Sequence, residues 1–307
     1  MRAAVLGLIA LGASAFACPP LSLQAIVPGV WLVPGAQEAP ARGNCGRVAN
    51  SVVLEGAQGL VMVDPGPTYK DGLRVRQLIR AQIGRPVVAV VATHAHPENV
   101  LAASVFVKPG VVFFASDITA ARMRRYCPRC RRNLRAAIGE DEIRGTRIVL
   151  PRQTIQSARA TVELAGVTLT VLRFEGGHLP GNIALYDAAR GVLLAGGLVN
   201  NRQIPQMRDA QLADWAAVLA ELADLAPAHV LPGHGPAGDA GLIAAMRGYF
   251  EQLERSVGAD VQTGNDAASA PQRLAFPDYR DWAEYLPEHG LNVQKRWREA
   301  EQELFDR

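Results

Sequence analysis

THAHPEN, residues 93–99, follows the apolar and largely β-branched run PVVAVVA at residues 86–92. Two further short motifs each carry a histidine, GGHLPGN at residues 176–182 and LPGHG at residues 231–235. Two histidines one residue apart at an irregular strand end point their imidazoles to one side, where a divalent cation can collect more ligands from distant loops. The three motifs, in this order, therefore predict one metal site assembled from three loops.

Strand and helix patterns alternate along the rest of the chain, and each histidine motif falls at a strand end. Strands with helices outside them predict an α/β fold with a two-layer sheet core. The expected strands are 24–33, 47–55, 60–63, 87–92, 111–115, 161–174 with a turn at 165–166, 183–187, 192–196 and 229–231. The expected helices are 70–83, 117–138 with an interruption at Cys127-Pro128, 210–225 and 239 to about 256.

The amino terminus has the pattern of an export signal. Arg2 precedes an apolar run from Ala3 to Phe16 that is too short to span a bilayer, and Ala15-Phe16-Ala17 fits the A-x-A cleavage pattern. We interpret residues 1–17 as a removable signal peptide, which predicts a periplasmic or secreted protein that is not held in a membrane after cleavage. An uncleaved anchor, or a lipoprotein signal with an acylated Cys18, is the alternative.

The mature chain is long enough for one large domain with a substantial core. The net charge of the 307-residue chain is +3 at pH 7, and this weak charge argues against a nucleic-acid partner. We place the domain at residues 18–258. The polar stretch from Ala259 to Gln272 predicts an exposed loop, so residues 259–307 are expected to form a loop and a helical carboxyl-terminal extension.

Four cysteines are compatible with disulfides in an oxidising compartment, and the sequence allows three pairings. We favour Cys127 with Cys130 as a local staple, and Cys18 with Cys45. A C-x-x-C motif can also belong to a redox site or to half a zinc knuckle. However, the chain has no second C-x-x-C and no thioredoxin-like βαβ pattern around this one.

The three histidine motifs, with VMVDPG upstream at residues 61–66, resemble the metallo-β-lactamase superfamily over roughly residues 25–255. The resemblance implies a four-layer αβ/βα sandwich with metal at one edge. NCGRVAN at residues 44–50 and the segment from Leu291 to Glu301 are similar to exported zinc metallohydrolases associated with quinoprotein relay and sulfur-oxidation systems.

The chain departs from the family pattern at the second metal site. The family's first motif usually reads H-x-H-x-D-H, whereas Glu98 and Asn99 occupy its last two positions here. Gly197 stands where the family has a metal-bridging Asp. Carried over by position, the resemblance implies a first site of His94, His96 and His178. It leaves a degenerate second site with His234 and Glu98, and His234 can equally be a substrate contact.

Three neutral imidazoles can hold a zinc ion with one open position, where a bound water can have a pKa of about 7. We therefore expect about one zinc ion per chain, and a zinc-bound hydroxide that attacks an ester, thioester, lactone or lactam carbonyl. Glu98 is the candidate catalytic residue that accepts or shuttles the proton of the water; otherwise it is an exposed carboxylate at a helix start. The alternative function is a catalytically impaired binding or accessory protein of a periplasmic redox system.

Other polar residues near the motifs allow two interpretations. Asp64 either accepts a hydrogen bond that fixes the His94 loop or belongs to an ordinary Asp-Pro-Gly turn. Asn182 is expected to brace the loop that carries His178. His229 and His289 are expected at the surface or in packing contacts, and neither is assigned to the metal.

One segment of the chain is strongly basic. It could receive an anionic small-molecule substrate or an acidic protein partner, and its alternative is a solvated helix face whose charge is balanced by the neighbouring acidic residues. Its residues are Arg122, Arg124, Arg125, Arg129, Arg131, Arg132 and Arg135.

The signal-peptide interpretation predicts that protein isolated from the native host begins at Cys18. Amino-terminal sequencing of the exported protein checks this. Cytoplasmic protein that still starts at Met1 would contradict it.

Overall fold

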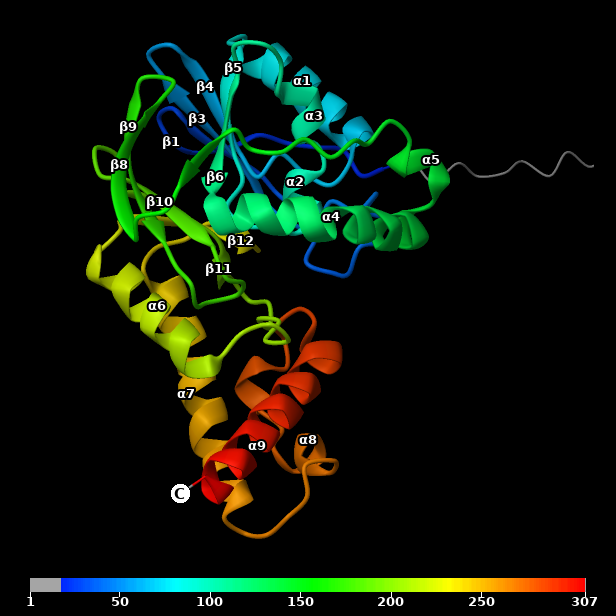
Figure 1. Ribbon diagram of the computed structural model, residues 1–307, viewed down its shortest axis with the longest axis vertical. Coiled ribbons are helices and arrows are strands. Elements are labelled where there is room, and N and C mark those ends of the chain that lie inside the picture. The colour runs from blue at the N-terminus through cyan, green and yellow to red at the C-terminus, as the bar shows by residue number, and fades with distance from the viewer. Residues whose placement is uncertain (1–17, 307) are drawn as a thin grey trace, which may run out of the picture.

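The computed structural model describes residues 18–306, so the expected signal peptide lies outside the described residues. Two β-sheets stack face to face, and helices cover the outer face of each sheet (Figure 1). This four-layer arrangement confirms the predicted α/β sandwich. Within residues 18–306, no helix is long and apolar enough to cross a bilayer.

The first sheet has seven strands in chain order, antiparallel from β1 to β4 and parallel from β4 to β7. Its strands are β1 (Gln24–Val27), β2 (Val30–Val33), β3 (Ser51–Gly56), β4 (Gly59–Val63), β5 (Val87–Val91), β6 (Val112–Ser116) and β7 (Gln153–Ile155). The predicted strand 24–33 is thus a hairpin of two strands that turns at Gly29, whose φ is 78°.

The second sheet has five strands in the order β12-β11-β10-β9-β8, and only β11 and β12 run parallel. Its strands are β8 (Arg159–Leu164), β9 (Val167–Arg173), β10 (Ile183–Asp187), β11 (Val192–Asn200) and β12 (His229–His234). All nine residues of β11 are buried, as expected for an interior strand with covered faces.

The helical layers follow the chain order. The helices are α1 (Tyr69–Gln82), α2 (Pro97–Val100), α3 (Ala103–Phe106), α4 (Asp117–Ile138), α5 (Glu140–Ile143), α6 (Leu212–Asp224), α7 (Gly241–Val261), α8 (Ala270–Arg273) and α9 (Gly290–Phe305). A 3₁₀ turn (Pro277–Tyr279) and a π-helical turn (Tyr285–His289) precede α9. Helices α1, α3 and α4 lie on the first sheet, and α6 and α7 lie on the second (Figure 1).

Side-chain alternation along the strands produces the layers. On β3 and β4, Val53 and Met62 face the helices of the first layer, whereas Leu54 and Val61 face the second sheet. Successive strand residues point to opposite faces, so a strand that is apolar on both faces is covered on both. Each sheet therefore shares one core with its helices and one with the other sheet.

The predicted break in the long helix is wrong, because α4 continues through Pro128. A proline inside a helix costs about 3 kcal/mol. Pro128 lies on the exposed face of α4, while Met123, Cys127 and Leu134 of the same helix are buried against the first sheet. The packing of this apolar face on both sides of Pro128 offsets the local cost.

The carboxyl-terminal extension packs on the second sheet's helices. α7 runs to Val261, past the expected boundary at residue 258, and α9 packs on α7. Val293 and Trp297 of α9 join the apolar core that contains Trp215 of α6. The indole of Trp297 also donates a hydrogen bond of 3.0 Å to Asp260. The extension and the sandwich therefore share one core.

Of the two expected disulfides, one is correct and one is wrong. Cys18 and Cys45 are joined, with their Cα atoms 5.6 Å apart, whereas Cys127 and Cys130 are free. Because α4 is unbroken, it directs Cys127 into the core and leaves Cys130 half-buried. Burial, with Cys130 nearby, raises the pKa of the Cys127 thiol to about 12, which keeps it protonated and unreactive.

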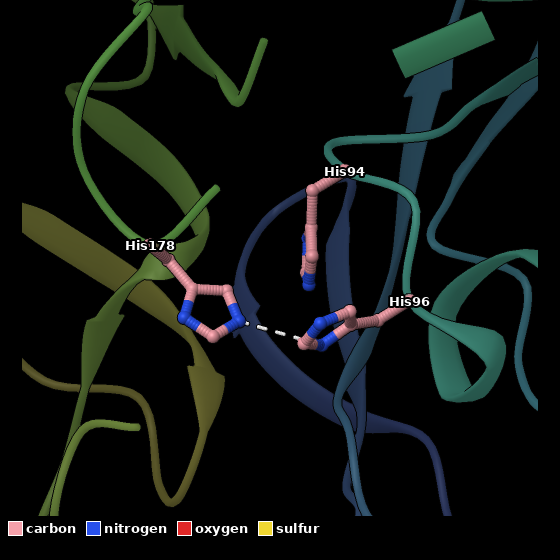
Figure 2. Close-up of side chains that lie close together, drawn as sticks. All are labelled: His94, His96 and His178. Carbon is pink, nitrogen blue, oxygen red and sulfur yellow. Dashed lines mark hydrogen bonds between the residues drawn. The ribbon is translucent and has the colours of Figure 1, made fainter. Parts of the chain in front are cut away.

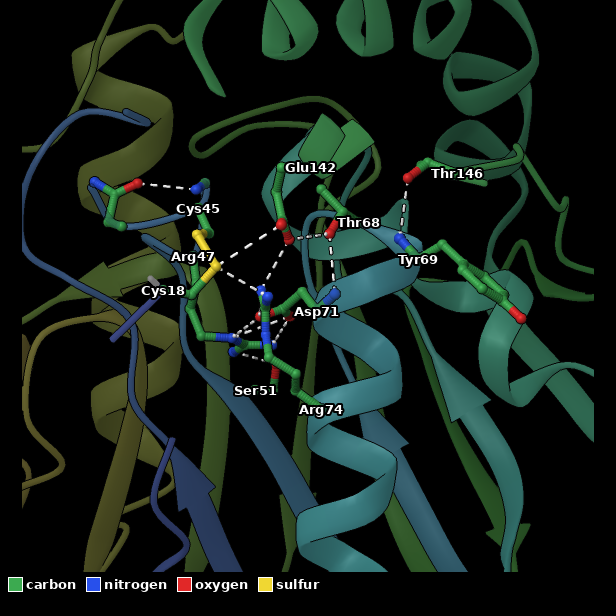
Figure 3. Close-up of polar contacts among 12 residues, drawn as sticks. Cys18, Cys45, Arg47, Ser51, Thr68, Tyr69, Asp71, Arg74, Glu142 and Thr146 are labelled. Carbon is green, nitrogen blue, oxygen red and sulfur yellow. Dashed lines mark hydrogen bonds and ion pairs between the residues drawn. A yellow bond between two sulfur atoms is a disulfide. The ribbon is translucent and has the colours of Figure 1, made fainter. Parts of the chain in front are cut away.

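The disulfide lies beside a cluster of charged groups (Figure 3). Arg47 forms a buried ion pair with Asp71 and donates to Ser51 at 3.1 Å. Arg74 of α1 forms ion pairs with Asp71 of the same helix and with Glu142 of α5. Its guanidinium lies 2.9 Å from the Cys18 sulfur. Glu142 also lies close to both cysteines. These three residues are not assigned to a metal, because the two sulfurs are bonded to each other. This cluster therefore joins Cys18 and the segment from Cys45 to Ser51 to the helices α1 and α5.

We predict that Cys127 and Cys130 remain thiols in oxidised protein. Unfolded, unreduced protein treated with iodoacetamide should carry two labels, at Cys127 and Cys130, because only these sulfurs are unbonded. Peptide mass spectrometry locates the labels, and prior reduction should raise their number to four. Protection of both residues without reduction would contradict the structure.

Candidate metal centre

Three imidazoles from two sheets converge at one edge of the sandwich (Figure 2). His94 follows β5, His96 is the residue before α2, and His178 lies in the loop between β9 and β10. One ring nitrogen from each lies within 4.8 Å of the others. The structure thus brings together the three residues that the sequence assigns to the first metal site.

A chain of hydrogen bonds sets the tautomer of His94. The carboxylate of buried Asp64 accepts from the Thr93 amide at 2.8 Å and from the Thr93 hydroxyl at 2.6 Å. Because its own proton goes to Asp64, the Thr93 oxygen accepts from His94 Nδ1 at 2.9 Å. His94 Nε2 is then left with a free lone pair. Of the two interpretations of Asp64, the one that fixes the His94 loop is confirmed.

Carbonyl oxygens set the tautomers of two more histidines in the same way. His178 Nδ1 lies 3.3 Å from the carbonyl oxygen of Gln206, and His234 Nδ1 lies 2.9 Å from that of Val48. A carbonyl only accepts, so each Nδ1 carries the proton and each Nε2 has a free lone pair. As predicted, Asn182 braces the His178 loop, since its Oδ1 accepts from the Leu179 amide at 2.9 Å.

Burial keeps these imidazoles neutral. It lowers the pKa of His94 and of His178 well below the ordinary value, and the neighbouring imidazoles lower both further. Burial also lowers the pKa of His234, although Glu98 and the Val48 carbonyl oppose it. Metal ligation requires a neutral imidazole, so burial prepares these side chains to bind a cation at neutral pH.

The residues fit a bound metal ion. His94 Nε2 is buried without a hydrogen-bond partner in the described part of the chain, and an isolated buried polar atom is costly. His178 Nε2 and His96 Nδ1 lie 3.3 Å apart beside it. A divalent cation would satisfy the Nε2 lone pairs of His94 and His178 together with one ring nitrogen of His96, and a set of three nitrogen ligands is typical of open zinc sites.

Glu98 lies at this centre rather than at the surface. Its carboxylate is 3.2 Å from His96 Nδ1, and its side chain is 13% exposed. Burial opposes its ionisation, but the interactions with His96, the backbone and His234 together outweigh burial and lower the pKa of Glu98 to about 2. Burial raises the pKa of Asp64 to about 7 against the hydrogen bonds from Thr93, and a bound cation would favour its ionised form.

Three further motif positions, His234, Asn99 and Gly197, contribute no nitrogen to the three-histidine group. His234 lines the same cavity but lies outside the group of three nitrogens. Asn99 is fully buried close to the Asp64 carboxyl, and its interaction with that carboxyl opposes the rise of the Asp64 pKa. A Cβ at Gly197 would lie 2.9 Å from His94 Cε1, so the His94 ring fills the space where a side chain at position 197 would begin.

Gly196 allows the two sheets to approach each other behind the centre. It has a φ of 51°, and a Cβ there would lie 2.4 Å from the Thr93 hydroxyl oxygen. The pairing of β11 with β12 also shifts register between Leu194 and Gly196. This irregular backbone on the second sheet therefore makes room for the Asp64–Thr93–His94 chain on the first.

The NCGRVAN segment braces the His234 loop. Asn50 donates from Nδ2 to the carbonyl oxygens of Pro232 and Gly235, at 2.9 and 2.7 Å, and its amide donates to Gly233 at 2.8 Å. Cys45 and Arg47 tie the same segment to the disulfide and to α1. The sequence showed only the family resemblance of this motif. Its bracing role could not be predicted, because the contacts join residues more than 180 positions apart in the sequence.

His96, His178 and His234 border a cavity of about 270 Å³ that the carboxyl-terminal extension helps to enclose. The sequence did not assign the other polar wall residues to the site, because they belong to no recognisable motif. The additional polar wall residues are Glu38, Asn200, Gln203, Gln206, Glu284 and Glu288.

The remaining candidates lie elsewhere. His289 is buried and contacts the Tyr249 hydroxyl at 3.1 Å and the Leu274 carbonyl at 2.8 Å, which is the expected packing role. His229 is half-buried at the start of β12. Arg122 lies near enough to influence the pKa of His94, but no residue of the basic segment from Arg122 to Arg135 lines the cavity.

We predict that Thr93→Val weakens zinc binding by about 10–100-fold, because it removes the hydroxyl that orients His94. Competition with a chromogenic chelator measures the affinity. Thr161→Val on the exposed face of β8 makes the same chemical change away from the centre and should have no effect. Equal affinities for Thr93→Val and wild type would show that the hydrogen-bond chain does not support the metal.

Solved structures share this fold at low sequence identity. A metallo-beta-lactamase from Pontibacter korlensis is 21% identical, with a TM-score of 0.61, over 75% of this chain and 99% of that one. The metallo-beta-lactamase FIM-1 from Pseudomonas aeruginosa in its mono-zinc form is 18% identical, with a TM-score of 0.61, over 76% of this chain and 96% of that one.

A double mutant of the sec-alkyl sulfatase PisA1 is 17% identical, with a TM-score of 0.69. The match covers 91% of this chain and 50% of the sulfatase. That share of this chain is too large to lie within residues 18–258, so the likeness reaches into the carboxyl-terminal extension. No curated protein matches the chain in sequence.

A sequence model of the metallo-beta-lactamase superfamily matches residues 46–234, which include all four histidines of the three motifs. The match spans more than half of the chain and agrees with the fold and with the converging imidazoles. This chain belongs to the metallo-beta-lactamase superfamily.

Proposed function

We propose that this chain is an exported, zinc-dependent hydrolase that cleaves an ester, thioester, lactone or lactam with one zinc ion per chain. One observation carries the proposal: three imidazole nitrogens from His94, His96 and His178 converge, and two of these residues, His96 and His178, line a cavity. Two of these imidazoles have tautomers that direct Nε2 lone pairs to the centre. This arrangement suits a Lewis-acid site with room for a substrate.

A zinc ion held by His94, His96 and His178 would supply a Lewis acid and would lower the pKa of a bound water to about 7. The protein supplies the remaining parts. Asp64 and Thr93 hold His94 in position, and the cavity admits the carbonyl group. Glu98 lies 3.2 Å from His96 and lines the cavity, so its carboxylate is placed to accept the proton of the attacking water.

Two positions favour a single zinc ion. Asn99 replaces an imidazole of the second site, and Gly197 supplies no bridging carboxylate. His234 and Glu98 alone offer too few ligands for a second tightly held zinc ion, since zinc sites normally have at least three protein ligands.

A disulfide bond within the described residues supports export. The Cys18–Cys45 disulfide is a feature of oxidising compartments, which agrees with a periplasmic or secreted protein whose signal ends at Ala17. The NCGRVAN segment also favours the exported subgroup associated with quinoprotein relay and sulfur oxidation. In this proposal the basic segment of α4, from Arg122 to Arg135, is a docking surface for an acidic protein partner.

The second candidate is a non-catalytic binding or accessory protein of a periplasmic redox system. The loss of the second-site ligands at positions 99 and 197 favours it. Such a protein would keep the fold and one metal ion while lacking turnover.

We predict about one zinc ion per purified chain and measurable hydrolysis of at least one activated ester, thioester, lactone or β-lactam. His94→Ala should lose both zinc and activity, because it removes one of three ligands. Glu98→Gln should keep its zinc and lose about 100-fold or more in kcat, as expected for the loss of a general base. Elemental analysis after dialysis and initial-rate assays measure these quantities.

Asn99→His tests the degenerate second site, because it restores an imidazole without crowding His94 as a side chain at Gly197 would. Its zinc content should rise from about one toward two ions per chain. Two tightly held ions in the unmodified protein would contradict the single-zinc proposal. One bound zinc ion without turnover of any substrate would favour the accessory protein.

A further inference from the structure

The wall of the metal cavity is rich in negative charge. Glu38, Glu98, Glu284 and Glu288 line it, and no lysine or arginine does. These four acidic side chains outnumber the two positive charges of a divalent ion. A cleft lined by one sign of charge concentrates ligands of the opposite sign. The cavity is therefore electrostatically unsuited to an anionic substrate.

Two buried amide groups in the same wall lack hydrogen-bond donors. Asn200 is 6% exposed and Gln203 is 7% exposed. The side-chain oxygens Asn200 Oδ1 and Gln203 Oε1 have no partner among the described residues, and both residues line the cavity. A buried carbonyl oxygen without a donor costs free energy. A molecule in the cavity that carries N–H donors would satisfy both oxygens.

The acidic wall segment is held against the sandwich. The amide of Ala283 donates to the Arg202 carbonyl at 2.8 Å, and the Ile204 amide donates back to Ala283 at 3.0 Å. Gln206 Nε2 donates to Glu288 at 3.1 Å, and the Gln206 carbonyl also contacts His178. Glu284 and Glu288 are thus connected through one loop to a residue of the metal centre.

From these observations we infer that the cavity selects carbonyl substrates that carry a cationic ammonium group. Glu284 and Glu288 provide the counter-charge, and Asn200 and Gln203 provide acceptors for the ammonium N–H groups. This inference rests on the proposed hydrolase function and assigns its substrate class. It replaces the expectation of an anionic substrate, because the arginines that prompted that expectation lie outside the cavity wall.

Three methyl esters of similar length isolate the charge. Methyl 6-aminohexanoate carries an ammonium group, methyl heptanoate carries a methyl group in its place, and monomethyl adipate carries a carboxylate. We expect kcat/KM to be about tenfold higher for the cationic ester than for the neutral one, and lowest for the anionic one. A higher kcat/KM for the anionic ester would overturn the inference.

The double variant Glu284→Gln, Glu288→Gln should bring the cationic and neutral esters to within about twofold of each other. Glu221→Gln, on an exposed position of α6, removes one charge elsewhere and should leave the preference intact. An unchanged preference in the double variant would show that these carboxylates do not select the substrate.

Calorimetry with 6-aminohexanamide separates this inference from the proposed hydrolase function, because binding of a stable amide does not require turnover. Zinc-loaded wild type should bind it at least tenfold more tightly than hexanamide. Gln203→Leu should weaken that binding without lowering the melting temperature, since it removes an unpaired buried polar group. Equal binding of both amides would overturn the inference even if esters are hydrolysed.

Elemental analysis of the double variant tests whether Glu284 and Glu288 bind the metal ion instead of the substrate. Its zinc content should equal that of wild type. A loss of bound zinc in the double variant would show that Glu284 and Glu288 bind metal, and would overturn the inference.

Discussion

The hydrogen bonds from Thr93 to the buried carboxylate of Asp64 are the constraint on which the metal centre depends. They consume the hydroxyl proton of Thr93, so the hydroxyl can only accept from His94 Nδ1. His94 Nε2 then faces the other imidazoles with a free lone pair. Without this chain the His94 ring could adopt either tautomer, and the buried nitrogen would not be committed to a ligand.

The sandwich makes these hydrogen bonds possible because it brings irregular strand ends from both sheets to one edge. β5 leads into the His94 loop, and the loop after β9 carries His178 from the other sheet. The close approach requires the left-handed backbone of Gly196, since any side chain there would collide with Thr93. The position of the metal centre is therefore a property of sheet packing as much as of the histidine motifs.

The sequence predicted the elements whose signals are local. The β-branched run 87–92 and the amphipathic segment 70–83 became β5 and α1 within about one residue, and the three-histidine group followed from motif spacing and family resemblance. The break at Pro128 was predicted wrongly because the packing of the buried face of α4 outweighs a local preference. The Cys127–Cys130 pairing was also predicted wrongly, because closeness in sequence does not bring the two sulfurs together on the unbroken α4. The wall residues Glu284 and Glu288 could not be predicted, because their place depends on how the extension docks.

That docking links the stability of the extension to the shape of the cavity. Asn292 of α9 donates to the Pro205 carbonyl at 2.8 Å and accepts from the Met207 amide at 3.2 Å, so it holds both sides of Gln206. The side chain of Gln206 binds Glu288, and its carbonyl contacts His178. A helix near the end of the chain thus positions both the acidic wall and one imidazole of the metal centre. Any change that loosens α9 should consequently disturb substrate recognition and metal binding together, although α9 supplies no ligand.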